Sequence, residues 1–345
     1  MKKKILALAI GAAVTAFTVP AMAAEVSVSG RAHMSIDQID NGASGAAKDS
    51  GMDVASNASR LRFAAKTEVV DGLTAMMQLE QTINFDRRTN KDVFTSRDSF
   101  FGLKGDFGLV RLGYFDTPTK KVRSFTDMFG DRIGDARNMT KGTFDKRFHN
   151  SVHYQTPEFS GLKLDAQYSA NNNADDELDN ETDATSVSLT YKNGPLTVMV
   201  AQESQGAGIT GGVTNDRKEA IRLGATYNVM KGMRVAAFYE DANEASNDNT
   251  VMGLGAYYDL NADYRLRGQY YIADESSAKN DGGSMMVVGI DRKFGKDLTL
   301  YAAYAATSND EGAKFSVVGG GHGSSVTTVN GKDVSAISLG AIYNF

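Results

Sequence analysis

Residues 60–83 read RLRFAAKTEVVDGLTAMMQLEQTI, and this stretch decides the fold class. Polar and apolar side chains alternate along its first half, as in Arg62 followed by Phe63, and again along its second half. A period of two indicates a β-strand with one polar and one apolar face. Asp71 and Gly72 stand between the halves and form a dipeptide that favours tight turns. The stretch therefore predicts an antiparallel hairpin.

The order of strand, short turn, strand and long polar loop recurs along the chain. Short turns are predicted at seven places, namely 71–72, 105–108, 157–161, 192–195, 230–232, 261–263 and 295–297. Eight long segments rich in Asp, Asn, Gly, Ser and Lys lie near 38–57, 85–97, 115–146, 170–184, 203–217, 240–250, 273–283 and 307–333. These connections join sixteen strands and leave both chain ends on the short-turn side. An even strand number with long loops at one end only is typical of a transmembrane β-barrel.

The composition also favours a closed sheet. The 345 residues include four prolines and no cysteine, and paired strands avoid proline because it lacks an N–H group. Without cysteine, disulfides, thiol catalysis and cysteine-bound metals are excluded. Lipid offers no hydrogen-bond partners, so a sheet in a membrane must close without edges around a polar lumen. A soluble sandwich or propeller also alternates, but it does not separate short turns from long loops in this way.

The N-terminus predicts export. Lysines at positions 2–4 precede an apolar stretch, and Ala21 and Ala23 form a small-residue cleavage site. This order is typical of a secretory signal peptide, so we expect residues 1–23 to be removed and residues 24–345 to form the barrel domain. No later run of eighteen apolar residues exists, which excludes a helical membrane protein. Loss of the three lysines changes the formal charge from −5 to −8, which argues against nucleic acid as a partner.

Other groups of potential ligands do not match known sites, so we predict no metal and no cofactor. His149 and His153 lie four residues apart on a predicted strand, roughly 13 Å, which is too far to share one ion. The acidic segment 175–183 lacks the spacing and the central glycine of a calcium loop, and we expect it to meet lipopolysaccharide through bridging cations. The glycine-rich segment 319–323 is expected to be a flexible loop, because it does not lie between a strand and a helix.

Several motifs carry a resemblance to a known family. They are AEVSVSG at 24–30, SRL at 59–61, FGLKGDFG at 101–108, NSVHY at 150–154 and a last strand that ends on Phe345. Over essentially the whole mature chain, the sequence resembles the Gram-negative general porins. The resemblance implies a homotrimer of sixteen-stranded, all-β antiparallel barrels in the outer membrane, among lipids and lipopolysaccharide. It also implies short periplasmic turns, long external loops and a third loop folded into each lumen.

The function that the resemblance implies is passive diffusion of ions and small hydrophilic solutes through a water-filled channel. A solute-specific channel is the alternative. An outer-membrane enzyme would need a nucleophile beside a histidine base, and no Ser or Asp near the four histidines stands out. An adhesin or structural barrel would use the external loops alone.

The resemblance further implies a constriction where acids of the third loop, 115–146, face arginines of the barrel wall. The acidic candidates are Asp127 and Asp131, followed by Asp135. The wall candidates are Arg60, Arg147 and Arg97, which match family positions, and Arg31, Arg62 and Arg111, which face inward by alternation. Arg97 shares strand parity with outward Phe101, so its inward placement requires a bulge between them. The mature charge and the acidic external loops predict a weak cation preference.

Overall fold

A computed structural model gives the fold of the protein. It describes residues 24–86, 94–140, 142–172, 182–206, 209–210, 213–214, 217–244, 248–276 and 280–345. The predicted signal peptide, 1–23, and most of the acidic fourth loop, 173–181, lie outside these residues. Within the described ranges, no helix combines the length and the hydropathy needed to cross a bilayer.

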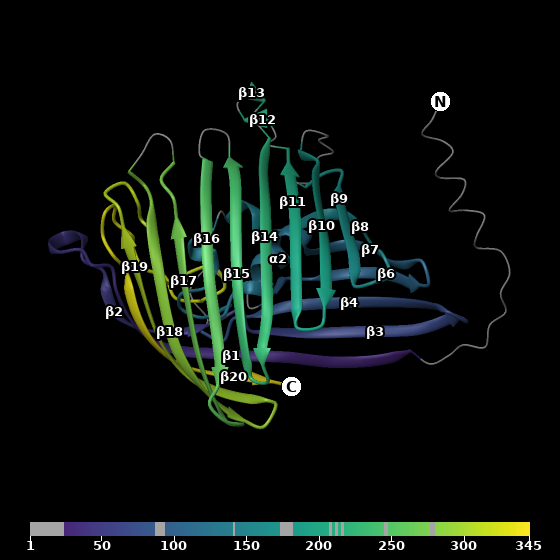
Figure 1. Cartoon of the computed structure of the whole chain (residues 1–345), viewed down its shortest axis with the longest axis horizontal. Helices are drawn as coiled ribbons and strands as arrows, with labels where there is room; N and C mark the ends of the chain where they lie inside the picture. Colours follow the sequence, from purple (N-terminus) through teal and green to yellow (C-terminus); the bar gives the residue numbers. More distant parts are fainter. Residues whose placement is uncertain are drawn as a thin grey trace.

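One antiparallel sheet closes into a barrel (Figure 1). Two of its eighteen strands, β2 (Ser50–Ser56) and β5 (Phe94–Ser96), pair along the same edges as β3 and β6 and continue those strands across short interruptions. Sixteen strands therefore surround the axis, which confirms the predicted fold class. They are β1 (Glu25–Asp40), β3 (Arg60–Val70), β4 (Leu73–Ile83), β6 (Ser99–Gly105), β7 (Gly108–Asp116), β8 (Arg147–Gln155), β9 (Leu162–Ser169), β10 (Ala184–Asn193), β11 (Leu196–Gln205), β14 (Lys218–Met230), β15 (Met233–Glu244), β16 (Asp248–Asp259), β17 (Tyr264–Ala273), β18 (Gly283–Phe294), β19 (Leu298–Asn309) and β20 (Ser335–Asn344). A separate short hairpin is formed by β12 (Ile209–Thr210) and β13 (Val213–Thr214).

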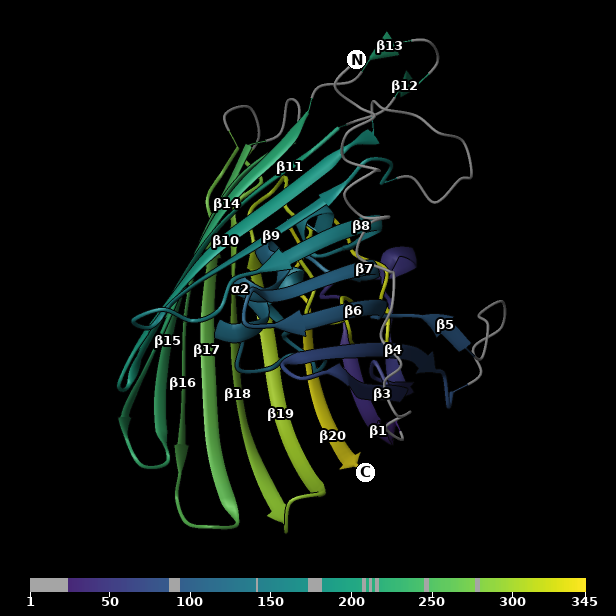
Figure 2. The ribbon, with the colours of Figure 1, turned by 90° about the vertical axis from the view of Figure 1, so that its right-hand side faces the viewer.

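The first and last strands of the sheet close the barrel. Strand β20 pairs with β1 from Arg31↔Asn344 to Asp40↔Ser335, and the two strands lie side by side in Figure 2. The backbone of Gly30 exchanges hydrogen bonds of 2.8 and 3.1 Å with Phe345. A Cβ atom on Gly30 would lie 2.3 Å from the Phe345 ring, so only glycine lets the C-terminal aromatic ring pack there.

All seven predicted short turns connect neighbouring strands, but strands take up half of one predicted long loop, 38–57, and most of another, 240–250. Strands β1 and β2 extend into the segment 38–57, and β15 and β16 leave only residues 245–247 between them. These extensions are rich in polar residues, although β2 carries the exposed apolar residues Met52 and Val54, and a short polar strand has much the same composition as a loop.

The alternation separates lipid from lumen as expected. Outward residues such as Phe63, Phe101 and Leu112 are about half exposed, whereas inward Arg222 and Glu240 are fully buried. The inward polar residues are buried because two long loops occupy part of the lumen.

The third loop (117–146) lies inside the barrel, and Figure 2 shows its helix α2 (Pro118–Thr126) enclosed by the strands. Thr117 caps the helix by accepting a hydrogen bond from the N–H of Lys120, and Pro118 occupies the first turn. The following residues, among them Phe129 and Ile133, pack in an apolar cluster against inward side chains of the wall, including Met285, Val287 and Tyr271.

The eighth loop (310–334) also folds inward. Val317 and Val318 belong to the same apolar cluster, and the carbonyl of Val317 accepts a 2.7 Å hydrogen bond from the N–H of Gly134 in the third loop. Helix α2 packs against β9, β10, β11, β14 and β15, and the apolar cluster extends to β19. Open space remains beside β1–β6.

Candidate functional site

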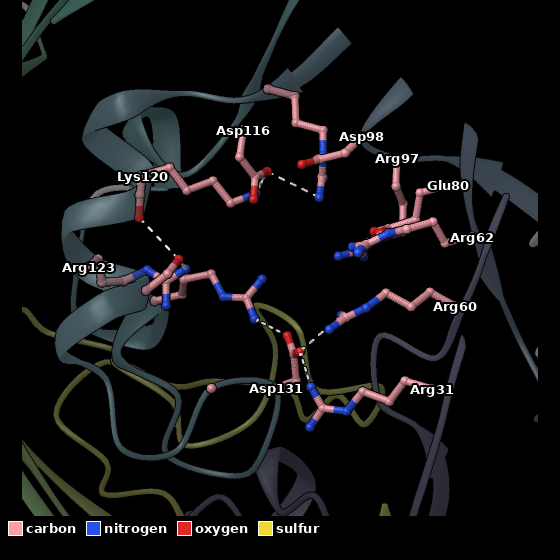
Figure 3. Close-up of a pocket in the computed structure, with 14 residues that line it drawn as sticks. Arg31, Arg60, Arg62, Glu80, Arg97, Asp98, Asp116, Lys120, Arg123 and Asp131 are labelled. Carbon is pink, nitrogen blue, oxygen red and sulfur yellow. Dashed lines mark hydrogen bonds and ion pairs between the residues drawn. The ribbon is translucent and has the colours of Figure 1, made fainter. Parts of the chain in front are cut away.

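A cavity of about 280 Å³ separates the third loop from the wall formed by β1, β3, β4 and the β5–β6 junction (Figure 3). Its lining is almost entirely charged. Eight cationic residues, four acidic residues, Ser124 and Gly130 surround it; the cationic ones are Arg31, Arg60, Arg62, Arg97, Lys120, Arg123, Arg137 and Arg147, and the acidic ones are Glu80, Asp98, Asp116 and Asp131.

Strand alternation places most of the wall arginines. Arg31 on β1 and Arg60 and Arg62 on β3 project from the wall toward the third loop, as Figure 3 shows. Arg62 contacts Glu80 of the neighbouring strand β4 at 2.5 Å. The structure therefore brings together the arginines that alternation predicts to face inward on these two strands.

Arg97 reaches the cavity through a bulge. Ser96 pairs with Gln81 and Phe100 pairs with Gln78, so four steps on one strand match three on the other. The extra residue reverses the parity, and Arg97 points inward while Phe101 faces outward. The Nε atom of Arg97 lies 2.7 Å from the second oxygen of Glu80, so one carboxylate bridges Arg62 and Arg97.

Among the predicted acids, only Asp131 lines the cavity. Its Oδ2 atom lies 3.3 Å from Arg31 and 3.6 Å from Arg60, and its Oδ1 atom lies 2.7 Å from Arg137. The backbone of Asp131 has a φ of +63°, a left-handed conformation that costs free energy outside glycine. Asp131 therefore joins the third loop to the arginine wall directly.

Asp127 and Asp135 differ from the expectation, because their side chains are buried inside the third loop and do not reach the cavity. Asp127 accepts hydrogen bonds from the backbone N–H groups of Phe129 and Ala136, at 2.9 and 3.1 Å. Both carboxylates contact Arg123, and Asp135 also binds Arg137 at 2.6 Å. They stabilise the turn of the loop. A sequence pattern cannot distinguish an aspartate with this role from one that faces the lumen.

The buried carboxylates of the loop depend on these arginines. Burial opposes ionisation of Asp135, but Arg137 and Arg123 outweigh it and hold the pKa of Asp135 below its usual range. Burial likewise opposes ionisation of Asp145, and Arg123 and Arg222 hold its pKa below the usual range. Both carboxylates therefore stay charged at neutral pH.

The two remaining predicted arginines, Arg147 and Arg111, lie in different places. Arg147 lines the cavity and lies 2.5 Å from Asp98 and 3.1 Å from Asp116. Arg111 faces the lumen outside the cavity, with its guanidinium 4.9 Å from the ring centre of Phe100 and 4.3 Å from that of Phe115. Its contacts with the aromatic rings hold it against the wall.

Several lining residues were not among the predicted site residues. They are Glu80, Asp98, Asp116, Lys120, Arg123 and Arg137. Glu80 could have been found, because it shares inward parity with Gln78 on a strand whose outward positions are apolar. The charged residues of the third loop could not have been found, because that segment has no strand-like alternation that would show which side chains face the lumen.

The charges of the lining do not balance. The lining holds eight cations and four anions. Arg123 and Arg137 are already paired with the buried Asp127 and Asp135, which leaves six cations against four anions, a formal excess of two positive charges. An aqueous passage with such a lining attracts anions and repels cations. Within the described residues, no three potential metal ligands gather at one point.

Comparisons with known proteins agree with the fold. A family profile described as Gram-negative porin matches residues 7–312. The chain is 29% identical over 332 residues to outer membrane porin protein 32 of Delftia acidovorans, covering 90% of this chain and 91% of that protein. It is also 29% identical over 203 residues to the major outer membrane protein P.IB of Neisseria meningitidis serogroup B, a match that spans 58% of each chain.

Solved structures show the same fold. An anion-selective porin from Comamonas acidovorans superposes with a TM-score of 0.77 at 21% identity, over 94% of this chain and all of that one. OmpT of Vibrio cholerae superposes with a TM-score of 0.69 at 16% identity, over 96% of this chain and all of that one. Since the family profile covers most of the sequence, the chain belongs to the Gram-negative porin family.

Proposed function

We propose that this outer-membrane porin is a general diffusion channel whose narrowest passage is the charged cavity between the third loop and the β1–β6 wall. The observation that carries the proposal is the lining itself: twelve charged side chains surround a space of about 280 Å³. Charged, hydrated walls admit small hydrophilic solutes and exclude apolar ones. The basic wall residues are Arg31, Arg60, Arg62, Arg97 and Arg147, and the acidic residue of the loop that faces them is Asp131.

We further propose that the channel prefers anions, in contrast to the weak cation preference that the net charge of the chain predicts. Asp127 and Asp135 are neutralised inside the third loop, so their charges do not act on the passage. Arg123 and Arg137, which neutralise them, are likewise cancelled, and the remaining excess of two positive charges, six cations against four anions, decides the local potential. A structural neighbour from Comamonas acidovorans is described as anion-selective, which supports the same direction.

Planar bilayer recordings test the proposal. Purified protein should insert, conduct ions and give a reversal potential of anionic sign in a potassium chloride gradient. Protein that inserts without conducting would contradict the channel. Conduction with a cationic reversal potential would contradict the anion preference alone. Saturable block by one class of solute would support the alternative of a solute-specific channel.

A homotrimer is proposed by analogy. One solved form of OmpT of Vibrio cholerae is described as a trimer, and the present barrel shares that fold. Its outward surface is apolar along the strands, as a surface that contacts lipid or neighbouring subunits requires. Cross-linking in detergent should give a trimeric band, and exclusively monomeric protein would contradict the assembly. The family and the fold are those of channel proteins, and we propose no catalytic activity.

A further inference from the structure

The eighth loop touches the ion pair at the edge of the cavity. A Cβ atom on Gly321 would lie 1.9 Å from Nη2 of Arg137 and 2.1 Å from Oδ1 of Asp131. The neighbouring Gly320 has a φ of +67°, and a Cβ atom there would lie 3.1 Å from Cβ of Arg137. The glycines therefore let the backbone of the eighth loop rest directly against Asp131 and Arg137, and a larger residue at 321 would force these two side chains to shift.

One end of this segment is attached to the third loop. Val317 is fully buried in the apolar cluster that also contains Ile133. Its carbonyl accepts the hydrogen bond from Gly134, which lies three residues after Asp131. Movement of the third loop would therefore break both an apolar contact and a backbone hydrogen bond.

The other end is attached to the barrel wall through His322. The N–H of Ser324 donates to Nδ1 of His322 at 3.2 Å, so the ring proton is assigned to Nε2. Nε2 lies 3.3 Å from the carboxylate of Asp37, which also accepts a 2.8 Å hydrogen bond from the hydroxyl of Ser324. The N–H of Gly323 donates to Oδ1 of Asn57 at 2.8 Å.

Both attachment points lie next to the arginine wall, although neither lines the cavity itself. Asp37 lies on β1, on the same inward face as Arg31, and Asn57 lies at the interruption between β2 and β3, three residues before Arg60. A segment bound to Gly134 on one side and to Asp37 on the other spans from the third loop to the arginine wall. It thus determines how far apart the two sides of the cavity stand.

We infer that residues 317–324 act as a strap that positions Asp131 and Arg137 and so determines the width and ion selectivity of the passage. The inference rests on the proposed channel function. The glycine-rich segment, which the sequence alone suggests is a flexible loop, is thereby a specificity-determining element: its backbone closes the gap between the third loop and β1.

The first test is Gly321→Ala in planar bilayers. The added methyl group should displace the Asp131 carboxylate from Arg31 and Arg60, and the anion-to-cation permeability ratio should rise about twofold to fivefold. The matched control is Gly142→Ala in the third loop, where a Cβ atom meets nothing within 4 Å and selectivity should stay that of the wild type.

The second test is release of the strap with His322→Ala. Loss of the contacts with Asp37 and Ser324 should raise single-channel conductance at least about 1.5-fold, because the passage widens. His322→Gln, with an amide that can donate to Asp37 and accept from Ser324, should restore conductance most of the way to the wild-type value. Wild-type conductance and selectivity in folded Gly321→Ala and His322→Ala channels would overturn the inference.

A labelling measurement separates the strap from the channel function. The natural chain has no cysteine, so Val317→Cys introduces a single, buried thiol. This thiol should resist a membrane-impermeant maleimide in the otherwise natural protein and react at least about tenfold faster when combined with His322→Ala. Equal maleimide reactivity of the thiol with and without His322→Ala would overturn the strap, even in a protein that conducts. A thiol that resists the maleimide in a protein that does not conduct would contradict only the proposed function.

Discussion

The two halves of the lumen are built from the same inward-facing strand positions but differ in what those positions contact. On the β14–β19 side, which we call the dry side, Gly255 and Gly289 stand where Met128 and Phe129 of the third loop pack, and the interface combines an apolar cluster with buried ion pairs. On the β1–β6 side, arginines occupy the inward positions and face an open cavity. Small wall residues create a docking surface, and long charged residues keep the opposite half open to water.

The difference assigns the two halves separate roles. Packing and buried ion pairs on the dry side hold the third loop in place. Exposed charges on the wet side act on permeating ions and contribute little to stability. Mutations in the first half should therefore change stability and conductance together, and mutations in the second should change selectivity alone.

The largest effect is expected from Arg222→Ala, which would remove the buried ion pairs of Arg222 with Asp145 and Glu240. Breaking a buried ion pair costs about 3–5 kcal/mol, so the free energy of unfolding in urea should fall by that order and conductance should rise as the third loop detaches. The control is Arg217→Ala, whose pair with Asp183 is exposed. An unfolding free energy and a conductance like those of the wild type would mean that this pair does not hold the loop.

Acid should weaken the same dry-side network. The pKa values of Asp135 and Asp145 are lowered in the folded protein. The two carboxylates therefore stabilise docking of the third loop at a pH above their pKa in the unfolded chain, about 3.9. That contribution is lost as the pH falls toward their pKa values in the folded protein. Conductance measured from pH 8 downward should stay level to about pH 4 and rise below it. A rise that begins near neutral pH would show that other groups control the loop.

A smaller effect is expected from Gly289→Ala, because a methyl group there would lie 3.0 Å from Cε1 of Phe129 and 3.0 Å from the carbonyl of Ala302. Overpacking of this kind costs about 1–3 kcal/mol, visible as a lower urea midpoint with higher conductance noise. Gly268→Ala on the adjacent strand is the control, since its nearest contact would be an ordinary 3.5 Å. Equal midpoints for the two variants would remove close packing as the reason for glycine at 289.

The smallest effect on stability is expected in the wet half. Arg60→Gln should change the free energy of unfolding by less than about 1 kcal/mol, because the side chain is partly exposed and contacts Asp131 at 3.6 Å. The anion-to-cation permeability ratio should nevertheless fall about twofold to fivefold. Arg292→Gln removes the same charge from the exposed side chain of an arginine on β18 and should leave the reversal potential unchanged. Equal shifts in both variants would mean that net charge, not the cavity, sets selectivity.

The alternation of residues determined the barrel and most of the wall. A strand side chain can face only lipid or lumen, so parity alone placed Arg31, Arg60 and Arg62. Turn-favouring residues identified the turns at Asp71-Gly72 and its equivalents. Parity also showed that Arg97 can face the lumen only if a bulge separates it from Phe101, and the structure has that bulge between the two residues.

The tertiary structure alone decided what the loops do. Asp127, Asp131 and Asp135 occur in one loop without a regular period, and only the packing of that loop on β14–β19 buries the first and third while turning Asp131 to the arginines. The same holds for Gly321, whose partners Asp131 and Arg137 lie nearly two hundred residues away in the sequence. Contacts between distant segments depend on how the closed barrel brings loops together, and no local pattern records that.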